Sequence, residues 1–257
     1  MGEMIRLTLG LVLSAAIGAS LGLLGGGGSI ITLPVLVYVL GVDVYQAVGM
    51  SLAVVGATSL VGAALHGQRG RVSLKVGAVF GVFGAIGAMI GARLTHLLSP
   101  SALLLAFASL MLVVSVLMLT RESNAEAMAG PPRFNPVKAA AAGALVGALT
   151  GFLGVGGGFL VVPALIFFAG LTIRESIGTS LLVIAINSFA GLVGHLERER
   201  FDLRLTALVT LCAVGGALIG SALSHRISPR GLRKSFAVFV LAVALLLVAE
   251  NYAVLFR

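Results

Sequence analysis

Long uncharged windows constrain the fold of this 257-residue chain more than any other feature of its sequence. Eight windows contain no Asp, Glu, Lys or Arg, and they cover residues 7–42, 44–68, 76–92, 94–120, 139–173, 176–196, 205–225 and 235–249. A hydrocarbon core about 30 Å thick needs roughly 20 helical residues to cross it. Within that core, only helices and closed barrels satisfy every backbone N–H and C=O group. The windows therefore predict an all-α polytopic membrane protein.

The composition excludes an ordinary water-soluble domain, because 59% of the residues are hydrophobic and only 10% are charged, against about 25% charged in soluble proteins. The formal net charge of +8 does not indicate a nucleic-acid partner, since the 17 Lys and Arg are spread over short connectors and form no continuous basic stripe. We expect a lipid bilayer around the chain instead. The single cysteine, Cys212, excludes an intrachain disulfide and a cysteine metal cluster, and we expect neither a metal nor a cofactor.

Two of the windows, 7–42 and 139–173, are too long for one crossing, because a straight helix of that length would measure about 50 Å. Each contains a glycine-rich break followed by a proline: residues 25–28 and Pro34 in the first, residues 154–158 and Pro163 in the second. Glycine runs of this density do not sustain a helix. Each long window therefore predicts a first helix, a break and a short helix of about a dozen residues.

The two breaks belong to an internal repeat with an offset of 129 residues. From residue 22 to residue 100, 27 of 79 positions are identical to the residue 129 places later. Shared apolar composition could explain matches of Leu or Val, but not the paired Pro34 and Pro163 or the paired His66 and His195. The sequence therefore predicts one membrane domain, 1–257, with repeat 1 at 5–119, a linker at 120–138 and repeat 2 at 139–250.

Each repeat is predicted to contain five helical pieces: the broken pair and three transmembrane helices. Counting Lys and Arg on each side of the membrane does not distinguish parallel from inverted repeats. The densest basic connector contains Arg226, Arg230, Arg233 and Lys234, whereas the equivalent connector around Arg93 has almost no basic residues. Opposite charge bias in equivalent connectors favours inverted repeats, with parallel repeats as the alternative.

The glycine breaks are the strongest candidates for a binding site. Such a break leaves the N–H groups of the next short helix pointing into the gap, and with the helix dipole they can bind an anion without any formal charge. We therefore expect Gly27, Gly28, Gly156 and Gly157 to bind an anionic substrate. Isolated glycines such as Gly87 and Gly91, in Gly-x-x-x-Gly spacing, predict close helix packing instead.

Polar side chains in the following helices are further candidates. Ser51, Thr179 and Ser180 begin the third piece of each repeat, and their hydroxyls could donate to a bound oxyanion or bond back to their own helix. Further along lie Thr58, Ser59, Asn187 and Ser188. We expect Asn187 to contact substrate, because an unpaired buried amide is costly, with hydrogen bonding between helices as the alternative.

His66 and His195 end these helices, where the dipole favours a histidine whether or not it moves protons. We consider both as coupling residues and, alternatively, as structural caps. No Asp or Glu lies in the middle of any window, which argues against a cation substrate. Ser51 and His66 are separated by about 22 Å on one helix, so they cannot form a catalytic dyad. We expect no enzyme, although a pair of Ser51 with His195 stays open.

Taken together, the Gly-rich breaks with Pro34 and Pro163 and the stretches Ala47–Leu52 and Ser176–Leu181 resemble the TauE/SafE family of sulfite exporter-like permeases. The resemblance implies transport of sulfite, sulfoacetate or a related organosulfonate across the bacterial cytoplasmic (inner) membrane, and the sequence is compatible with a homodimer. An anion channel or a membrane assembly factor is the alternative function. The first repeat departs from the second at Ser29, against Gly158, and at Met50, against Thr179.

Overall fold

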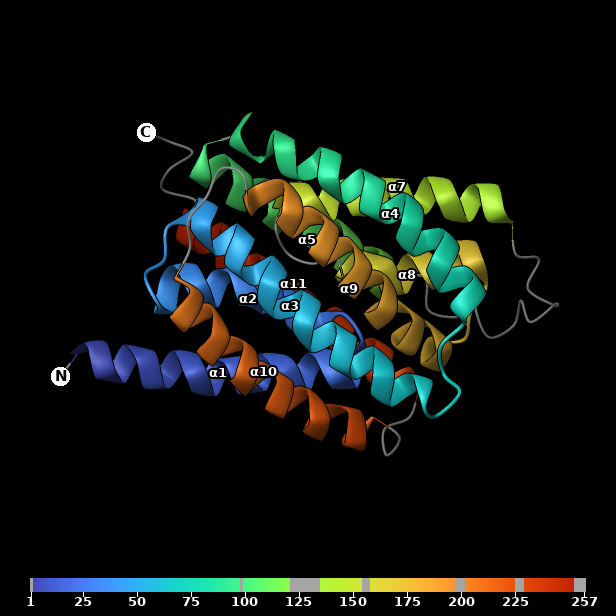
Figure 1. Ribbon diagram of the computed structural model, residues 1–257, viewed down its shortest axis with the longest axis horizontal. Helices are drawn as coiled ribbons and strands as arrows, with labels where there is room; N and C mark the ends of the chain where they lie inside the picture. Colours follow the sequence, from blue (N-terminus) through green and yellow to red (C-terminus); the bar gives the residue numbers. More distant parts are fainter. Residues whose placement is uncertain are drawn as a thin grey trace.

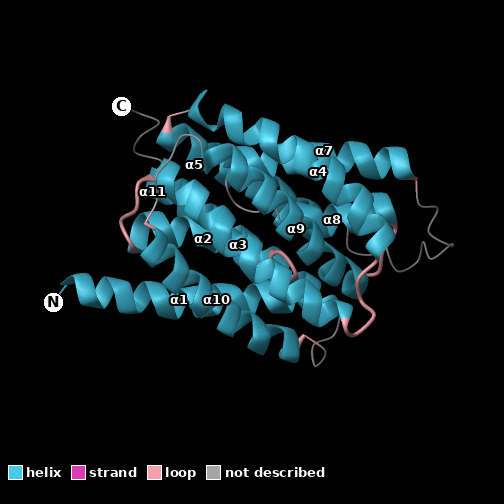
Figure 2. Cartoon of the chain, in the orientation of Figure 1, coloured by secondary structure: helices cyan, strands magenta, loops and turns pink. Residues whose placement is uncertain are grey.

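The computed structural model describes residues 2–97, 99–120, 135–153, 158–196, 202–224 and 229–251. Within those residues every regular element is a helix and no strand is present (Figure 2). Before the linker lie α1 (Gly2–Leu24), α2 (Gly27–Pro34) with a π-helical turn η1 (Val35–Val39), α3 (Val44–Gly67), α4 (Leu74–Leu94) with a 3-10 turn η2 (Thr95–Leu97), and α5 (Pro100–Thr120). After the linker lie α7 (Pro136–Leu153), α8 (Gly158–Ala169), α9 (Ile173–Leu196), α10 (Leu203–Leu223) and α11 (Pro229–Asn251).

Six of these helices, α1, α3, α4, α7, α9 and α10, are long and apolar enough to span a membrane. The prediction of an all-α polytopic membrane protein is confirmed. The first long window is broken at Gly25 and Gly26, between α1 and α2, as its length required. In the second window, α7 ends at Leu153 and α8 begins at Gly158, and residues 154–157 lie outside the described residues. The short helix after the first break is α2 with its π turn, and the short helix after the second is α8, of 12 residues.

Local sequence sets several of the helix boundaries. The Asp43 carboxylate accepts a hydrogen bond from the Tyr45 N–H at the start of α3, and Asp202 accepts from Arg204 and Leu205 at the start of α10. Such side-chain caps satisfy N–H groups that have no partner within the helix. The turns after η1 and α8 use glycines at equivalent positions, Gly41 (φ 70°) and Gly170 (φ 66°), in the left-handed region that side chains disfavour.

Glycine faces bring two helix pairs into close contact, α1 with α10 and α4 with α7, at opposite edges of the molecule (Figure 1). A Cβ atom on Gly87 or Gly91 of α4 would collide with the Ala144 or Ala148 carbonyl of α7. The predicted packing role of Gly87 and Gly91 is therefore confirmed. The same contacts recur elsewhere, with Gly147 and Gly151 of α7 against Gly84 and Ala88 of α4, Gly18 and Gly22 of α1 against Ala213 and Ala217 of α10, and Gly216 and Gly220 of α10 against Ala15 and Ala19 of α1.

Between these two edges lie α3 and α9, which pack against each other with antiparallel chain directions (Figure 1). As the residue number rises along α3, the number of its contact partner on α9 falls, from Leu52 with Gly191 to Gly62 with Leu181. These two contacts are the same pair with the repeats exchanged, because Leu52 is equivalent to Leu181 and Gly62 to Gly191. The centre of the molecule is therefore a pseudo-two-fold contact between equivalent helices.

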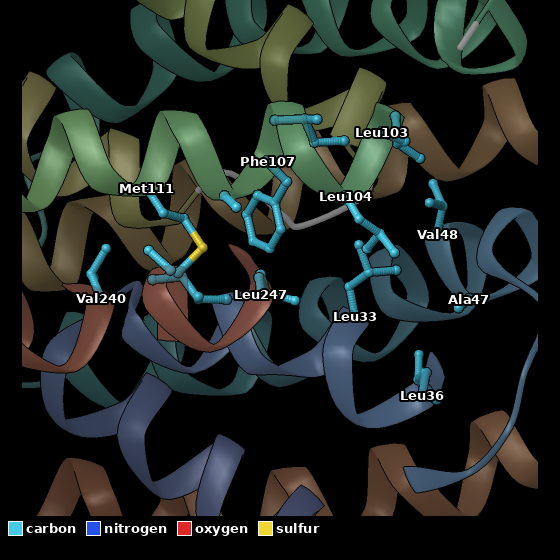
Figure 3. Close-up of a cluster of buried hydrophobic side chains, with 14 of the residues drawn as sticks. Leu33, Leu36, Ala47, Val48, Leu103, Leu104, Phe107, Met111, Val240 and Leu247 are labelled. Carbon is cyan, nitrogen blue, oxygen red and sulfur yellow. The ribbon is translucent and has the colours of Figure 1, made fainter. Parts of the chain in front are cut away.

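The largest apolar cluster joins α2, α3, α5 and α11 (Figure 3). Phe107 and Met111 of α5 lie against Leu247 of α11, while Leu33 of α2 and Leu104 of α5 are buried beside them. The outer faces are apolar too. Val82, Ile86 and Ile90 of α4 and Leu211 and Ile219 of α10 are each more than half exposed. A continuous apolar surface of this kind on transmembrane helices is one that lipid covers.

Candidate functional site

The two glycine breaks, far apart in the sequence, meet in space. Gly25 adopts the left-handed conformation (φ 76°) and ends the first helix. The backbone of Gly26 then touches the backbone of Gly158 so closely that a Cβ atom on either glycine would collide with the other. A Cβ on Gly158 would also meet the side chain of Ile184 on α9. The breaks therefore come together beside the central contact of α3 and α9.

Helix α2 begins at this meeting point without a side-chain cap. Its N-cap residue is Gly26, and no side chain accepts a hydrogen bond there. Gly27 and Gly28 are the first two residues of α2, so their N–H groups are among the four that a helix cannot satisfy internally. The capped starts of α3 and α10 are at connectors instead. The other predicted anion donors, Gly156 and Gly157, lie outside the described residues.

Gly28 also has a packing role that the sequence did not reveal. A Cβ atom on Gly28 would collide with the Ile17 carbonyl oxygen and with Leu21 of α1. The first break therefore turns α2 back tightly against α1. An alanine at Gly28 would disturb this contact whether or not the N–H group binds an anion, so it cannot separate binding from folding.

The predicted hydroxyls have different partners. The Ser180 hydroxyl, on α9, is 2.8 Å from the Ile177 carbonyl oxygen and 3.3 Å from that of Gly25, which ties α9 to the first break. Thr179 instead accepts a hydrogen bond of 2.9 Å from the Ser73 N–H, at the start of α4. Ser51 is fully buried on α3 at the position equivalent to Ser180. Ser180 thus contacts the first break, whereas Thr179 contacts the connector between α3 and α4.

The two histidines make the same contact in each half of the molecule. His66 Nε2 lies 3.2 Å from the Gly22 carbonyl oxygen, and His195 Nε2 lies 3.2 Å from that of Gly151. These carbonyls belong to the last turns of α1 and α7, where helix carbonyls have no intrahelical partner. As N–H donors, the histidines therefore brace the helix before each break. This geometry supplies a structural role for both of them.

Asn187 is fully buried, and neither atom of its amide has a hydrogen-bond partner among the described residues. The amide lies against Gly84 of α4, where a Cβ atom would collide with Asn187 Oδ1. Two serines share this property, since the hydroxyls of Ser59 on α3 and Ser188 on α9 are buried and unpaired as well. Ser59 and Ser188 occupy equivalent positions of the repeat.

Basic residues gather where α3 ends and α9 begins. A narrow crevice there is lined by Arg71 and Arg174, together with His66, Ile177 and Ser224. Arg69 lies close by and donates a hydrogen bond of 2.7 Å to the Ser221 carbonyl oxygen. The sequence suggested only a topological role for these cations. Because Arg71 and Arg174 are 103 residues apart, only the antiparallel packing of α3 on α9 could place them together.

One further hollow lies away from this centre. It is an open hollow near the start of α7 and the end of α8, lined by Lys138, Leu145, Phe167 and Phe168 among others. Its exposed apolar side chains suit contact with lipid rather than binding of a small polar solute. Within the described residues, no three His, Cys, Asp or Glu side chains gather as metal ligands.

Comparison with known proteins identifies relatives along almost the whole chain. Residues 10–247 match the family model described as Sulfite exporter TauE/SafE. A probable membrane transporter protein of Xylella fastidiosa (strain Temecula1) is 36% identical over 251 residues, covering 92% of this chain and 93% of the relative. The probable membrane transporter protein YdhB of Bacillus subtilis is 29% identical, covering 90% of this chain and 95% of the relative. No solved structure matches the chain at a significant level.

Proposed function

Because the chain belongs to the TauE/SafE sulfite exporter family and is a multi-pass membrane transporter, we propose that it is a secondary transporter of a small sulfur oxyanion. The proposed substrate is sulfite, sulfoacetate or a related organosulfonate. The observation that carries this proposal is the contact between the two glycine breaks at Gly26 and Gly158, beside the uncapped start of α2.

The proposal that the substrate is an anion rests on elimination. An ion that leaves water pays a desolvation cost of several kcal/mol even after the protein relaxes. No Lys or Arg lies within any of the eight uncharged windows, so a buried cation cannot offset that cost. The positive end of α2 and the N–H groups of Gly27 and Gly28 remain available, and such groups bind phosphate and sulfate in many proteins. Ser180 lies beside this break, with its hydroxyl 3.3 Å from the Gly25 carbonyl oxygen, and Ser51 and Asn187 are further proposed contacts of the substrate.

We further propose that the repeats are inverted and that transport proceeds by alternating access. Antiparallel packing of the equivalent helices α3 and α9 supports inversion, because parallel repeats would give equivalent helices the same direction across the membrane. Transporters with inverted repeats place broken helices and their binding sites at the repeat interface. The breaks here lie at that interface. If each repeat adopted the conformation of the other, the site would open to the opposite side of the membrane. The membrane would be the cytoplasmic membrane of a bacterium.

The hydrolase alternative gains no support from the pair of Ser180, on α9 of the second repeat, and His66, on α3 of the first repeat. The Ser180 hydroxyl is bonded to the carbonyls of Ile177 and Gly25, and His66 Nε2 is bonded to the carbonyl of Gly22. A nucleophilic serine needs its hydroxyl within hydrogen-bond distance of the base. Each of these two groups is bonded to backbone carbonyls instead.

Counterflow in proteoliposomes tests the proposed function. Vesicles loaded with unlabelled sulfite should take up labelled sulfite transiently and with saturation, and sulfoacetate and sulfate should compete to different extents. A channel would pass anions without saturation in the same concentration range. Absence of any protein-dependent flux of sulfur oxyanions would overturn the proposal in favour of an assembly factor.

A further inference from the structure

Ser59 and Ser188 are exceptional among the buried hydroxyls of the described residues. Hydroxyls in membrane helices commonly donate to the carbonyl one turn earlier in the same helix. Thr58, the neighbour of Ser59, does so, with its hydroxyl 2.7 Å from the Val54 carbonyl oxygen. Ser14 and Thr150 do the same. Ser59 and Ser188 are fully buried, yet their hydroxyls have no hydrogen-bond partner in the part of the chain that the structure describes.

An unpaired buried hydroxyl is costly, because its donor has lost water without gaining another acceptor. One such group could be an isolated defect. Here the two groups are equivalent residues of the two repeats, separated by the repeat offset of 129. The duplicated occurrence indicates that the position itself requires a free hydroxyl in each half.

Ser188 lies where α9 packs against α3, since a Cβ atom on Gly56 of α3 would lie 3.2 Å from Ser188 Cβ. Ile184, one turn before Ser188, contacts Gly158, at the far end of the second break. His195, two turns after it, lies against the Gly151 carbonyl, at the near end of the same break. Residues separated by three or four positions share one face of a helix. Ser188 therefore lies on the face of α9 whose neighbouring residues contact both ends of the second break.

Ser59 occupies the corresponding place on α3. His66, two turns after Ser59, lies against the Gly22 carbonyl at the near end of the first break. Asn187, adjacent to Ser188, adds a buried amide whose two polar atoms are both unpaired. Unpaired polar atoms thus lie on both central helices, within the apolar centre of the molecule, and the amide of Asn187 lies toward Gly84 of α4.

We propose that Ser59 and Ser188 donate hydrogen bonds to the transported anion, one serine at each glycine break, and that they determine which oxyanion is accepted. This inference rests on the proposed function. Neither donor has a hydrogen-bond partner among the described residues, whereas an anion with several oxygen atoms would accept from both hydroxyls and from the N–H groups of the breaks. Such a site would discriminate strongly between oxyanions, because an anion that lacks one of the acceptor oxygens leaves a buried donor unpaired.

Cysteine accessibility tests the position of the two serines independently of the substrate's identity. In a Cys212→Ala background, Ser59→Cys and Ser188→Cys should react with a water-soluble thiosulfonate that carries a sulfonate group, and sulfite should slow the reaction. Ser14→Cys is the matched control, since Ser14 is equally buried but bonded to the Gly10 carbonyl. Reaction of Ser59→Cys and Ser188→Cys no faster than that of Ser14→Cys would overturn the proposal.

Alanine variants test the hydrogen bonds themselves. Ser59→Ala and Ser188→Ala should each weaken sulfite binding by about tenfold or more, as expected for one hydrogen bond to a charged group, while the melting temperature stays the same or rises. Ser14→Ala should leave sulfite binding unchanged. Unchanged sulfite affinity in both serine variants would overturn the proposal. If the cysteines react but the parent protein binds no sulfur oxyanion, the hydroxyls line an anion path and the proposed substrate is wrong.

Discussion

The two halves of the molecule share their backbone contacts but differ in the polar side chains around the centre. In both halves a histidine, His66 or His195, braces the last turn of the helix before the break at the same distance. In both halves a glycine, Gly41 or Gly170, turns the chain out of the short helix with a positive φ. These contacts depend on backbone geometry, and a duplicated segment retains that geometry as long as it keeps these glycines and histidines.

The side chains on these matching backbones have diverged. Asn187 in the second half is equivalent to Thr58 in the first. The larger side chain of Asn187 lies against Gly84 of the first half, whose equivalent in the second half is Ala213. Thr179 bonds the Ser73 N–H, while its equivalent Met50 is buried in the apolar cluster. A symmetric backbone therefore surrounds an asymmetric set of polar groups, and a bound anion would contact the two halves unequally.

The largest expected difference between the halves is their orientation in the membrane. Leu74 and Leu203 are equivalent and 71% and 74% exposed, at the first residues of α4 and α10. In a Cys212→Ala background, Leu74→Cys and Leu203→Cys should be labelled from opposite sides of oriented vesicles by a membrane-impermeant thiol reagent. The expected result is nearly complete labelling of one variant and almost none of the other. Labelling of both from the same side would exclude inverted repeats.

The asymmetric pair Asn187 and Gly84 should give the next largest effect. Gly84→Ala places a methyl group against the Asn187 amide, and overpacking of this kind costs about 1–3 kcal/mol. We expect a lower melting temperature in detergent for Gly84→Ala.

The double variant Gly84→Ala with Asn187→Thr reproduces the residue types found at the equivalent positions of the repeat, Ala213 and Thr58, and should recover most of the lost stability. Ala213→Gly, at the position of the second half that is equivalent to Gly84, is the matched control; it should cost about 1 kcal/mol through helix propensity and a further amount through loss of a buried methyl group. A double variant no more stable than Gly84→Ala would show that Asn187 does not fill the space at Gly84.

Replacement of the histidines should affect both halves equally. His66→Ala and His195→Ala each remove a donor to a buried carbonyl, and an unpaired buried acceptor costs about 1–3 kcal/mol, although the Thr95 hydroxyl, at 3.5 Å, remains a weak second donor to the Gly151 carbonyl. Two similar decreases in melting temperature are expected, because the two contacts have the same geometry. An effect confined to one histidine would contradict the equivalent bracing of the two breaks.

The histidines also test proton coupling. His66→Gln and His195→Gln retain an N–H donor but do not titrate, so we expect transport to keep its pH dependence between about pH 5 and 8, the range in which histidine ordinarily changes its charge. If the pH dependence disappears in either variant while expression is unchanged, that histidine takes part in coupling.

Thr179 should give the smallest effect. Thr179→Val removes the acceptor for the Ser73 N–H, and the net contribution of such a hydrogen bond is about 1 kcal/mol. We expect a slightly lower melting temperature and a substrate affinity close to that of the parent. A loss of affinity of tenfold or more, without a change in stability, would instead place Thr179 in the binding site.

Much of the fold could be predicted because lipid imposes a simple requirement on the sequence. Charges cannot lie in the hydrocarbon core, so the uncharged windows located the helices, and the length of two windows required the breaks. Predictions for individual polar residues were less specific. A serine or threonine in such a helix has the same local sequence signal whether it bonds its own helix, as Thr58 does, or remains unpaired, as Ser59 does.

The sequence by itself therefore determined the membrane environment, the helical class, the breaks and the repeat, because these follow from charge, length, glycine content and self-similarity along one chain. Only the tertiary structure decided which of these elements meet. The contact of Gly26 with Gly158, the pairing of Asn187 with Gly84, and the crevice between Arg71 and Arg174 all join residues separated by about a hundred positions or more. Such contacts depend on the direction in which α3 packs against α9, and local helix periodicity is the same for both directions.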